Sequence, residues 1–284
     1  MFRDVAYSVF GCLLAMAATT AFAQEPQVRA YKSVGDRSLS VHVFKPEAAS
    51  SPRPAVLMFH GGGWVAGEPE WTYPAARNFQ DLGLVAIPVQ YRLSGDGVTP
   101  ADALVDACDA FAWVRGHASE LGVDPARVAG YGVSAGGHLV SAATLGACPN
   151  GGKGADLLLL WSPALDLSKD GWVRRLLGGA DPASISPLAL ASPGGPATVV
   201  IQGAADTLTP LRGALAFCEA MGGAASDCRV HSYPGLGHLL TRNLDNQESD
   251  FDIDPVARRD GEERLSVFLV ERGYAQAVRV RPGS

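Results

Sequence analysis

Ser134 lies at the centre of a Gly-Val-Ser-Ala-Gly sequence at 132–136, between an apolar run at 127–131 and a small-residue run at 137–143. A preceding strand and a following helix distinguish a nucleophile elbow from a chance Gly-x-Ser-x-Gly match. Glycine two residues to either side of the serine removes side chains that would collide with the neighbouring strand or helix. A helix starting here also directs free N–H groups and its positive dipole end at the reaction centre. The pattern predicts a nucleophilic serine, with a Gly/Ser-rich helix start as the alternative.

A glycine triplet upstream offers a second chemical group. The apolar run 53–59 leads into His-Gly-Gly-Gly-Trp at 60–64, and three consecutive glycines are costly to order. The exposed amides of Gly62 and Gly63, with that of Ala135, could bind the oxyanion of a tetrahedral acyl-transfer intermediate. A flexible loop and a phosphate cradle are the alternatives. The phosphate cradle needs a Gly-Lys-Ser/Thr or Gly-x-Gly-x-x-Gly continuation, which does not follow here.

Together, the two motifs resemble those of the α/β-hydrolase superfamily, in its hormone-sensitive-lipase-like and feruloyl- or acetyl-xylan-esterase-like branches. The resemblance extends over nearly all of the chain after its N-terminal segment. It implies an α/β-hydrolase fold: a mostly parallel eight-stranded sheet with helices on both faces and a short lid. It also implies a serine esterase without a cofactor. The two motifs are highly specific for the superfamily and only weakly specific for a substrate.

The same resemblance implies where the two partners of Ser134 lie. Gly-Ala-Ala-Asp-Thr-Leu-Thr-Pro at 203–210 resembles the family's acid loop and places the acid at Asp206. Pro-Gly-Leu-Gly-His at 234–238 resembles the family's histidine loop and places the base at His238. His238 would accept the hydroxyl proton of Ser134, while Asp206 would fix the histidine tautomer and stabilise the imidazolium. Asp166, which follows the preceding expected strand, is an alternative acid, and a structural role is the alternative for His238.

Length and composition favour one large α/β domain. The chain has 284 residues, 47% of them hydrophobic, which is enough to bury a large core. Expected strands alternate with helical stretches, as in a parallel sheet covered on both faces. The net charge of −6 offers no basic patch, so nucleic acid is not an expected partner and a polyanionic substrate is disfavoured. No residue spacing suggests zinc or a calcium loop, so no metal is expected.

The first residues have the pattern of a secretory signal peptide. An apolar stretch at 5–18 follows an arginine, and Ala-Phe-Ala at 21–23 is a small-x-small cleavage site. We therefore expect residues 1–23 to be a signal peptide and residues 24–284 to be the catalytic domain. The expected location is periplasmic or secreted, without a membrane anchor.

Four cysteines remain after that segment, and four permit three disulfide connectivities. We favour Cys218–Cys228, because a helix running back into the last expected strand can bring them close, with Cys108–Cys148 as the second pair. Four buried free thiols are the alternative, because the core is large enough to fold without disulfides.

Residues 167–196 lie where the family inserts its lid, and they are few, with one predicted helix at 170–177. A short lid makes an open, shallow site and argues against long-chain triglycerides. Trp64, Trp161 and Trp172 lie near the expected pocket and are candidate substrate contacts, with core packing as the alternative for each.

The sequence thus predicts a secreted serine carboxylesterase that acts through an acyl-enzyme. Its expected substrates are small-molecule or carbohydrate-linked esters with short or hydroxycinnamoyl acyl groups. An arylformamidase- or peptidase-like amide hydrolase is the alternative within the enzyme class. A non-catalytic hydrolase-fold binding protein is disfavoured, because such proteins usually lose a triad residue or the glycine loop. The sequence leaves the oligomeric state open.

Overall fold

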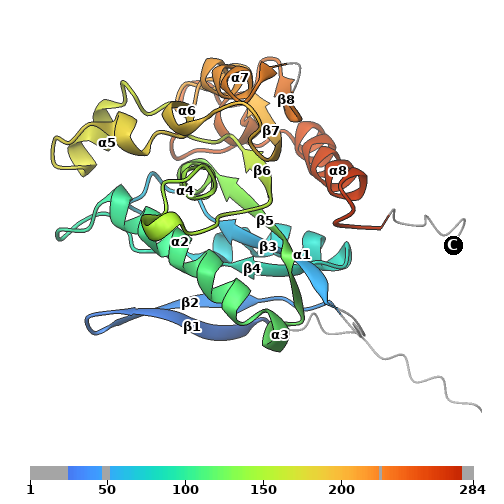
Figure 1. The fold of residues 1–284 in the computed structure, drawn as a ribbon. Coiled ribbons are helices and arrows are strands. Elements are labelled where there is room, and N and C mark those ends of the chain that lie inside the picture. Colours follow the sequence, from blue (N-terminus) through green and yellow to red (C-terminus); the bar gives the residue numbers. More distant parts are fainter. Residues whose placement is uncertain (1–24, 47–51, 224–225, 277–284) are drawn as a thin grey trace, which may run out of the picture.

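The computed structural model describes residues 25–46, 52–223 and 226–276, so the expected signal peptide lies outside the described residues. Six parallel strands form the central sheet in the order β4-β3-β5-β6-β7-β8 (Figure 1). They are β3 (Arg53–Phe59), β4 (Val85–Pro88), β5 (Val123–Val133), β6 (Leu157–Trp161), β7 (Ala197–Gly203) and β8 (Cys228–Tyr233). All five residues of β6 and the last six of β3 are buried, as expected for strands with helices on both faces.

An antiparallel hairpin supplies the other two strands, β1 (Gln27–Val34) and β2 (Arg37–Val43). Isolated bridges from Val41 to Val89 and from Phe44 to Ala86 attach it beside β4. The expected eight strands are therefore present as a parallel sheet of six and a hairpin of two. The prediction of a mostly parallel α/β sheet is confirmed.

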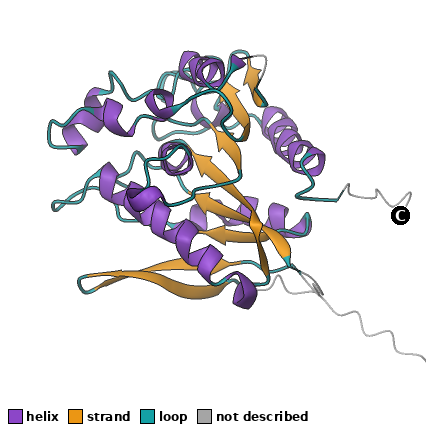
Figure 2. Cartoon of the chain, viewed as in Figure 1, coloured by secondary structure: helices purple, strands orange, loops and turns teal. Residues whose placement is uncertain are grey.

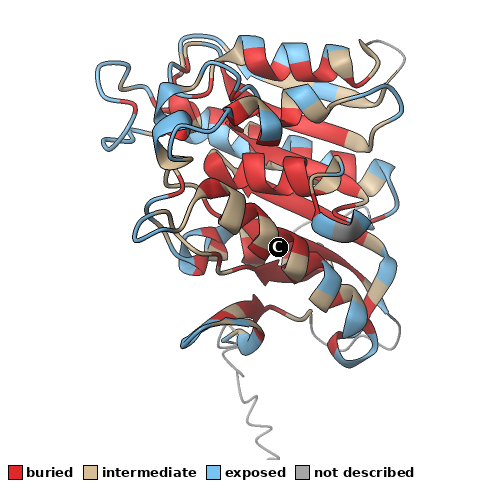
Figure 3. Cartoon of the chain, turned by 60° about the vertical axis from the view of Figure 1, so that its left-hand side comes forward, coloured by how far each residue is buried: buried red, intermediate tan, exposed pale blue. Residues whose placement is uncertain are grey.

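Helices cover both faces of this sheet (Figure 2). α1 and α8 pack on one face through Phe79, Leu265 and Phe268. α2, α4 and α7 pack on the other face, and the strands between the two layers are buried (Figure 3). The α-helices are α1 (Tyr73–Asp81), α2 (Pro100–Gly116), α3 (Ala118–Leu121), α4 (Ala135–Thr144), α5 (Gly171–Leu176), α6 (Pro187–Leu190), α7 (Leu211–Ala220) and α8 (Pro255–Glu271). The 3₁₀ turns are η1 (Pro69–Thr72), η2 (Pro149–Gly151), η3 (Pro182–Ile185) and η5 (His238–Leu240).

A buried carboxylate joins the hairpin to α2. Asp106 is fully buried and accepts hydrogen bonds from Lys32 Nζ at 2.6 Å and from Arg92 Nε at 2.8 Å. The Arg92 guanidinium also contacts the Asp102 carboxylate at 3.4 Å. A buried charge is stable only when it is paired in this way. These ion pairs hold β1, α2 and the loop after β4 together, which is a structural role.

Both favoured disulfide pairs are present. Cys108 of α2 bonds to Cys148 beyond the end of α4, and Cys218 of α7 bonds to Cys228 at the start of β8. The first pair ties together two segments on one face of the sheet. The second fixes the start of β8, the strand that precedes the loop carrying His238.

Candidate active site

Ser134 occupies a sharp turn between β5 and α4. Its backbone has φ 51° and ψ −115°, a strained conformation for a non-glycine residue. The turn is held by Ser134 N donating to Trp161 O at 3.0 Å and by Ala164 N donating to Ser134 O at 3.1 Å. A Cβ on Gly132 would lie 2.5 Å from the carbonyl oxygen of Gly136, and a Cβ on Gly136 would overlap that of Phe59. The two glycines are therefore required by close backbone contacts.

The structure brings Ser134, His238 and Asp206 into one line of hydrogen bonds. His238 Nε2 lies 3.1 Å from Ser134 Oγ, and His238 Nδ1 lies 2.8 Å from Asp206 Oδ2. Because a carboxylate only accepts, His238 Nδ1 carries the proton and Nε2 is free to accept from the serine hydroxyl. Both His238 and Asp206 are buried. Asp206 lies in the loop after β7 and His238 in the loop after β8. In the sheet, β6 separates these two strands from β5, the strand that ends at the Ser134 turn.

Four further donors hold the Asp206 carboxylate. Oδ1 accepts from the amides of Leu208 at 2.9 Å and Thr209 at 2.8 Å. Oδ2 accepts from Gln202 Nε2 at 2.9 Å and from the Thr209 hydroxyl at 2.8 Å. Our reading of the sequence missed Gln202 and Thr209. The signal for Gln202 was a polar residue directly after the apolar run 199–201 near the end of β7.

Asp166 does not contact His238 in this arrangement. Its Oδ1 accepts from Ser168 N at 3.1 Å and from Ser168 Oγ at 2.6 Å, and its side chain is exposed. This is the local turn-capping pattern of an aspartate in a loop. The geometry pairs the histidine with Asp206.

The glycine loop follows β3 and lies against the Ser134 turn. Gly62 and Gly63 have φ of 108° and 59°, values that favour glycine, and a Cβ on Gly61 would lie 3.3 Å from Ser134 Cβ. The amide nitrogens of Gly62, Gly63 and Ala135 donate no hydrogen bond within the described part of the chain. Ala135 begins α4, so its amide is one of the unpaired donors at that helix N-terminus.

His60 fixes the start of the glycine loop. Its ring stacks on Tyr91 at 4.3 Å between centroids, and its Nδ1 lies 2.6 Å from Gly61 O. The Tyr91 hydroxyl donates to His60 O at 2.9 Å. Burial lowers the pKa of His60 to about 4, so the ring is neutral at neutral pH. A Cβ on Gly67 would overlap the His60 ring.

Trp64 is buried in the core, with 4% of its surface exposed. Its Nε1 donates to His138 Nδ1 at 3.1 Å, and His138 Nε2 donates to Ile185 O at 3.0 Å. Burial lowers the pKa of His138 to about 4, which agrees with a neutral ring that accepts at one nitrogen and donates at the other. Trp64 therefore links the glycine loop, α4 and η3. We expected a substrate contact at this position, and the burial of the indole replaces that interpretation with a structural one.

Two exposed tryptophans flank the glycine loop. Trp172 of α5 is 43% exposed, and its Nε1 donates to Gly63 O at 3.2 Å. Trp71 of η1 is 56% exposed, and its ring lies 3.4 Å from the position of a Cβ on Gly62. Trp172 was a predicted substrate contact, whereas Trp71, which lies beside the same glycine loop, was not predicted from the sequence.

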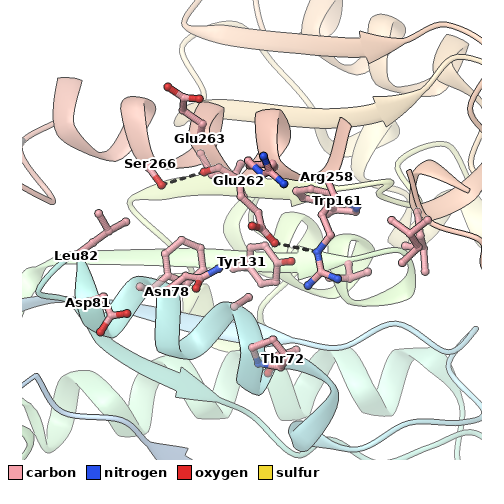
Figure 4. A pocket seen from close by; sticks show the side chains of 18 of the residues that line it. Thr72, Asn78, Asp81, Leu82, Tyr131, Trp161, Arg258, Glu262, Glu263 and Ser266 are labelled. Carbon is pink, nitrogen blue, oxygen red and sulfur yellow. Dashed lines mark hydrogen bonds and ion pairs between the residues drawn. The ribbon is translucent and has the colours of Figure 1, made fainter. Parts of the chain in front are cut away.

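Trp161, the third tryptophan expected near the pocket, lies at the end of β6 and is mostly buried. A Cβ on Gly261 would lie 2.8 Å from its ring, so the ring packs directly against α8. It also lines a cavity of about 790 Å³ between α1 and α8, together with Tyr131 and Glu262 (Figure 4). Trp161 thus faces the α1–α8 side of the sheet.

Among residues 25–46, 52–223 and 226–276, no group of three or more His, Cys, Asp or Glu side chains is arranged to hold a metal ion. None of the helices in these ranges has the length and apolar character needed to cross a membrane.

A family model described as alpha/beta hydrolase fold matches residues 56–242. The apo form of esterase 2 from Thermogutta terrifontis superposes with a TM-score of 0.78 at 31% identity, over 90% of this chain and 98% of that one. The same esterase has been solved with propionate bound, with butyrate bound and after phosphorylation by paraoxon.

Two curated relatives match shorter segments. Carboxylesterase NlhH of Mycobacterium tuberculosis is 35% identical over 130 residues, which are 45% of this chain and 40% of that protein. An arylesterase of Saccharolobus solfataricus is 34% identical over 111 residues, 39% of this chain and 36% of that protein. The matched segments cover less than half the length of these two proteins.

Proposed function

The chain belongs to the α/β-hydrolase fold family, and from the geometry of its site we propose that it is a serine carboxylesterase. One observation carries the proposal. A line of hydrogen bonds runs from Ser134 through His238 to Asp206, and the unpaired amides of a glycine loop lie beside it. This arrangement provides a nucleophile, a base and an anion site, which acyl transfer requires.

In the proposed acylation step, Ser134 Oγ attacks the ester carbonyl carbon while its proton passes to His238 Nε2. The carbonyl π electrons move onto oxygen, and the amides of Gly62, Gly63 and Ala135 stabilise the resulting oxyanion. When the tetrahedral intermediate collapses, the bond to the alcohol oxygen breaks and that oxygen takes the proton from Nε2. Asp206 stabilises the imidazolium throughout, through its bond to Nδ1.

Deacylation repeats these steps with water. A water molecule gives a proton to His238 Nε2 and attacks the acyl carbon. The oxyanion of this second tetrahedral intermediate is bound by the same three amides. Collapse returns the proton to Ser134 Oγ and releases the carboxylic acid. The overall reaction is a hydrolysis without a redox change, and water is its only co-reactant.

We propose esters with short or flat aromatic acyl groups as substrates, including hydroxycinnamoyl esters and esters on plant polysaccharides. The insertion between β6 and β7 contains only short helices in its described length, α5, η3 and α6. Its exposed Trp172 supplies a flat apolar surface beside the glycine loop. The propionate- and butyrate-bound forms of the Thermogutta esterase support a preference for short acyl groups.

A panel of p-nitrophenyl esters from acetyl to decanoyl, with methyl ferulate and an acyl anilide, tests this proposal. We expect the highest kcat/KM at acyl chains of about two to four carbons, because each methylene left in water forfeits about 0.8 kcal/mol. Ser134→Ala should lower kcat by about 10⁴-fold or more. A folded Ser134→Ala variant with wild-type turnover refutes the nucleophile. Rates that rise steadily to decanoyl refute the acyl preference, and faster anilide cleavage indicates an amide hydrolase.

We further propose that the protein is exported. Its two disulfides are compatible with an oxidising compartment. Mass spectrometry of the mature N-terminus tests this, with cleavage after Ala23 as the expected result.

A further inference from the structure

The loop between η5 and α8 buries a single side chain. Within residues 242–254, all of which the structure describes, Gln247 is the only buried residue, with 5% of its surface exposed. The two ends of the loop are joined by a backbone hydrogen bond from Arg242 N to Asp252 O at 2.8 Å and by an ion pair between the side chains of these two residues. The other residues of the loop are exposed or half-buried.

All three hydrogen bonds of Gln247 go to the loops that carry the acid and the base. Its Oε1 accepts from His238 N at 2.9 Å and from Thr207 N at 3.1 Å. Its Nε2 donates to Ala205 O at 3.1 Å. Thr207 and Ala205 flank Asp206, so one amide group contacts both chain neighbours of the acid and the backbone of the base.

The neighbouring backbone leaves room for this side chain. A Cβ on Gly237 would lie 2.6 Å from the Gln247 carboxamide, and a Cβ on Gly203 would overlap the carbonyl oxygen of Gly237. Glycine at both positions allows the acid loop, the histidine loop and Gln247 to meet at close range.

We infer that Gln247 is a positioning residue, which holds the Asp206 and His238 loops in the register that aligns His238 with Ser134. This inference rests on the proposed esterase function. Asp206 and His238 lie 32 residues apart in the chain, and their direct contact is one hydrogen bond to a rotatable imidazole. The carboxamide adds three bonds to backbone atoms, which cannot rotate away. A displacement of about 1 Å at a catalytic group can cost about 10²-fold in rate.

Two substitutions separate positioning from packing. Gln247→Leu keeps a similar volume but removes the partner of the buried His238 amide and of the half-buried Thr207 amide and Ala205 carbonyl. Gln247→Glu keeps both acceptor bonds, loses the donated bond to Ala205 O and adds a negative charge near His238. Glu248→Leu is the matched control, because the same side chain is introduced one position further along the loop, at an exposed residue.

We expect Gln247→Leu to lower kcat for p-nitrophenyl acetate by about 10- to 100-fold, with KM within about twofold. The rate of inactivation by paraoxon should fall in parallel, because it depends on the same serine. Gln247→Glu should retain more activity than the leucine variant and move the acidic limb of kcat/KM to higher pH, since a nearby carboxylate favours the charged imidazole. Glu248→Leu should match the wild type in all three measurements.

Wild-type kcat in a folded Gln247→Leu variant overturns the inference. A fall in kcat/KM that comes wholly from a higher KM also overturns it. If the leucine variant does not fold, the glutamate variant decides, because it loses the bond to Ala205 O. A pH-independent kcat below that of the wild type with unchanged KM supports positioning, and a wild-type kcat overturns it. A wild-type protein that neither hydrolyses esters nor reacts with paraoxon instead overturns the proposed function.

Discussion

Replacing Asp206 with asparagine changes one atom and should reverse the hydrogen bonding of the whole site. Oδ1 accepts from two backbone amides, of Leu208 and Thr209, so the asparagine oxygen must occupy that position. The new NH₂ then takes the place of Oδ2 and faces His238 Nδ1 and Gln202 Nε2. It must donate to Nδ1, which forces the histidine proton onto Nε2.

In that tautomer, Nε2 points a proton at Ser134 Oγ and cannot accept one. The expected loss in kcat is about 10⁴-fold, or about 5 kcal/mol of transition-state stabilisation. KM should change little, because the groups expected to contact substrate do not move. The NH₂ also opposes the donor on Gln202, so a lower melting temperature should accompany the loss.

The assay is hydrolysis of p-nitrophenyl acetate, with kcat and KM measured for Asp206→Asn and for Asp166→Asn as the control. Asp166 caps its own turn at an exposed position, so its variant should turn over within about twofold of the wild type. Retention of more than a tenth of wild-type kcat by Asp206→Asn would refute the orienting role of this carboxylate. Equal losses in both variants would place the acid function elsewhere.

Three further predictions follow from other parts of the molecule. Burial lowers the pKa of His60 and of His138 to about 4 from 6.5, so the unfolded chain binds more protons between these values. The free energy of unfolding should therefore be highest above pH 6.5 and fall by about 3 kcal/mol per histidine as pH drops to about 4. Urea titrations across this pH range would measure the change, and an unfolding midpoint that does not vary with pH would contradict buried neutral rings. Trp172→Ala should raise KM for methyl ferulate several-fold more than for p-nitrophenyl acetate, and equal changes would exclude an aromatic acyl contact. Replacing Cys108 and Cys148 with alanine should lower the free energy of unfolding by roughly 4 kcal/mol, from a loop of 40 residues, and a change below about 1 kcal/mol would argue against the pairing.

The groups proposed for chemistry could be located from sequence because each lies in a short motif at the end of a strand. The glycines around Ser134 and the loops ending at Asp206 and His238 carry their own steric requirements, so local sequence was sufficient. Parallel strands bring their carboxyl ends to one edge of the sheet, which explains why residues more than 100 positions apart meet there.

Side-chain direction was the part that sequence could not supply. Trp64 follows three glycines and has φ 66°, a rare conformation that directs its indole into the core rather than toward solvent. Gln247 is one polar residue in a polar loop, and nothing in its immediate sequence distinguishes it from Asn246. Its burial depends on how the chain returns from η5, which is a tertiary property.

The hydrogen-bonded chain from Trp64 through His138 to Ile185 has a consequence for anyone who redesigns the substrate pocket by exchanging the segment between β6 and β7. The imidazole needs an acceptor for its Nε2 proton, and that acceptor is a main-chain carbonyl of the exchanged segment. A transplanted segment without a carbonyl at this point would leave the buried Nε2–H of His138 without an acceptor. The Trp64 indole, which donates to the other nitrogen of the same ring, would then lose its fixed partner. Chimeras should therefore succeed when they preserve the path of residues 182–187, whatever sequence they carry, and specificity can be altered most freely in the exposed helix α5.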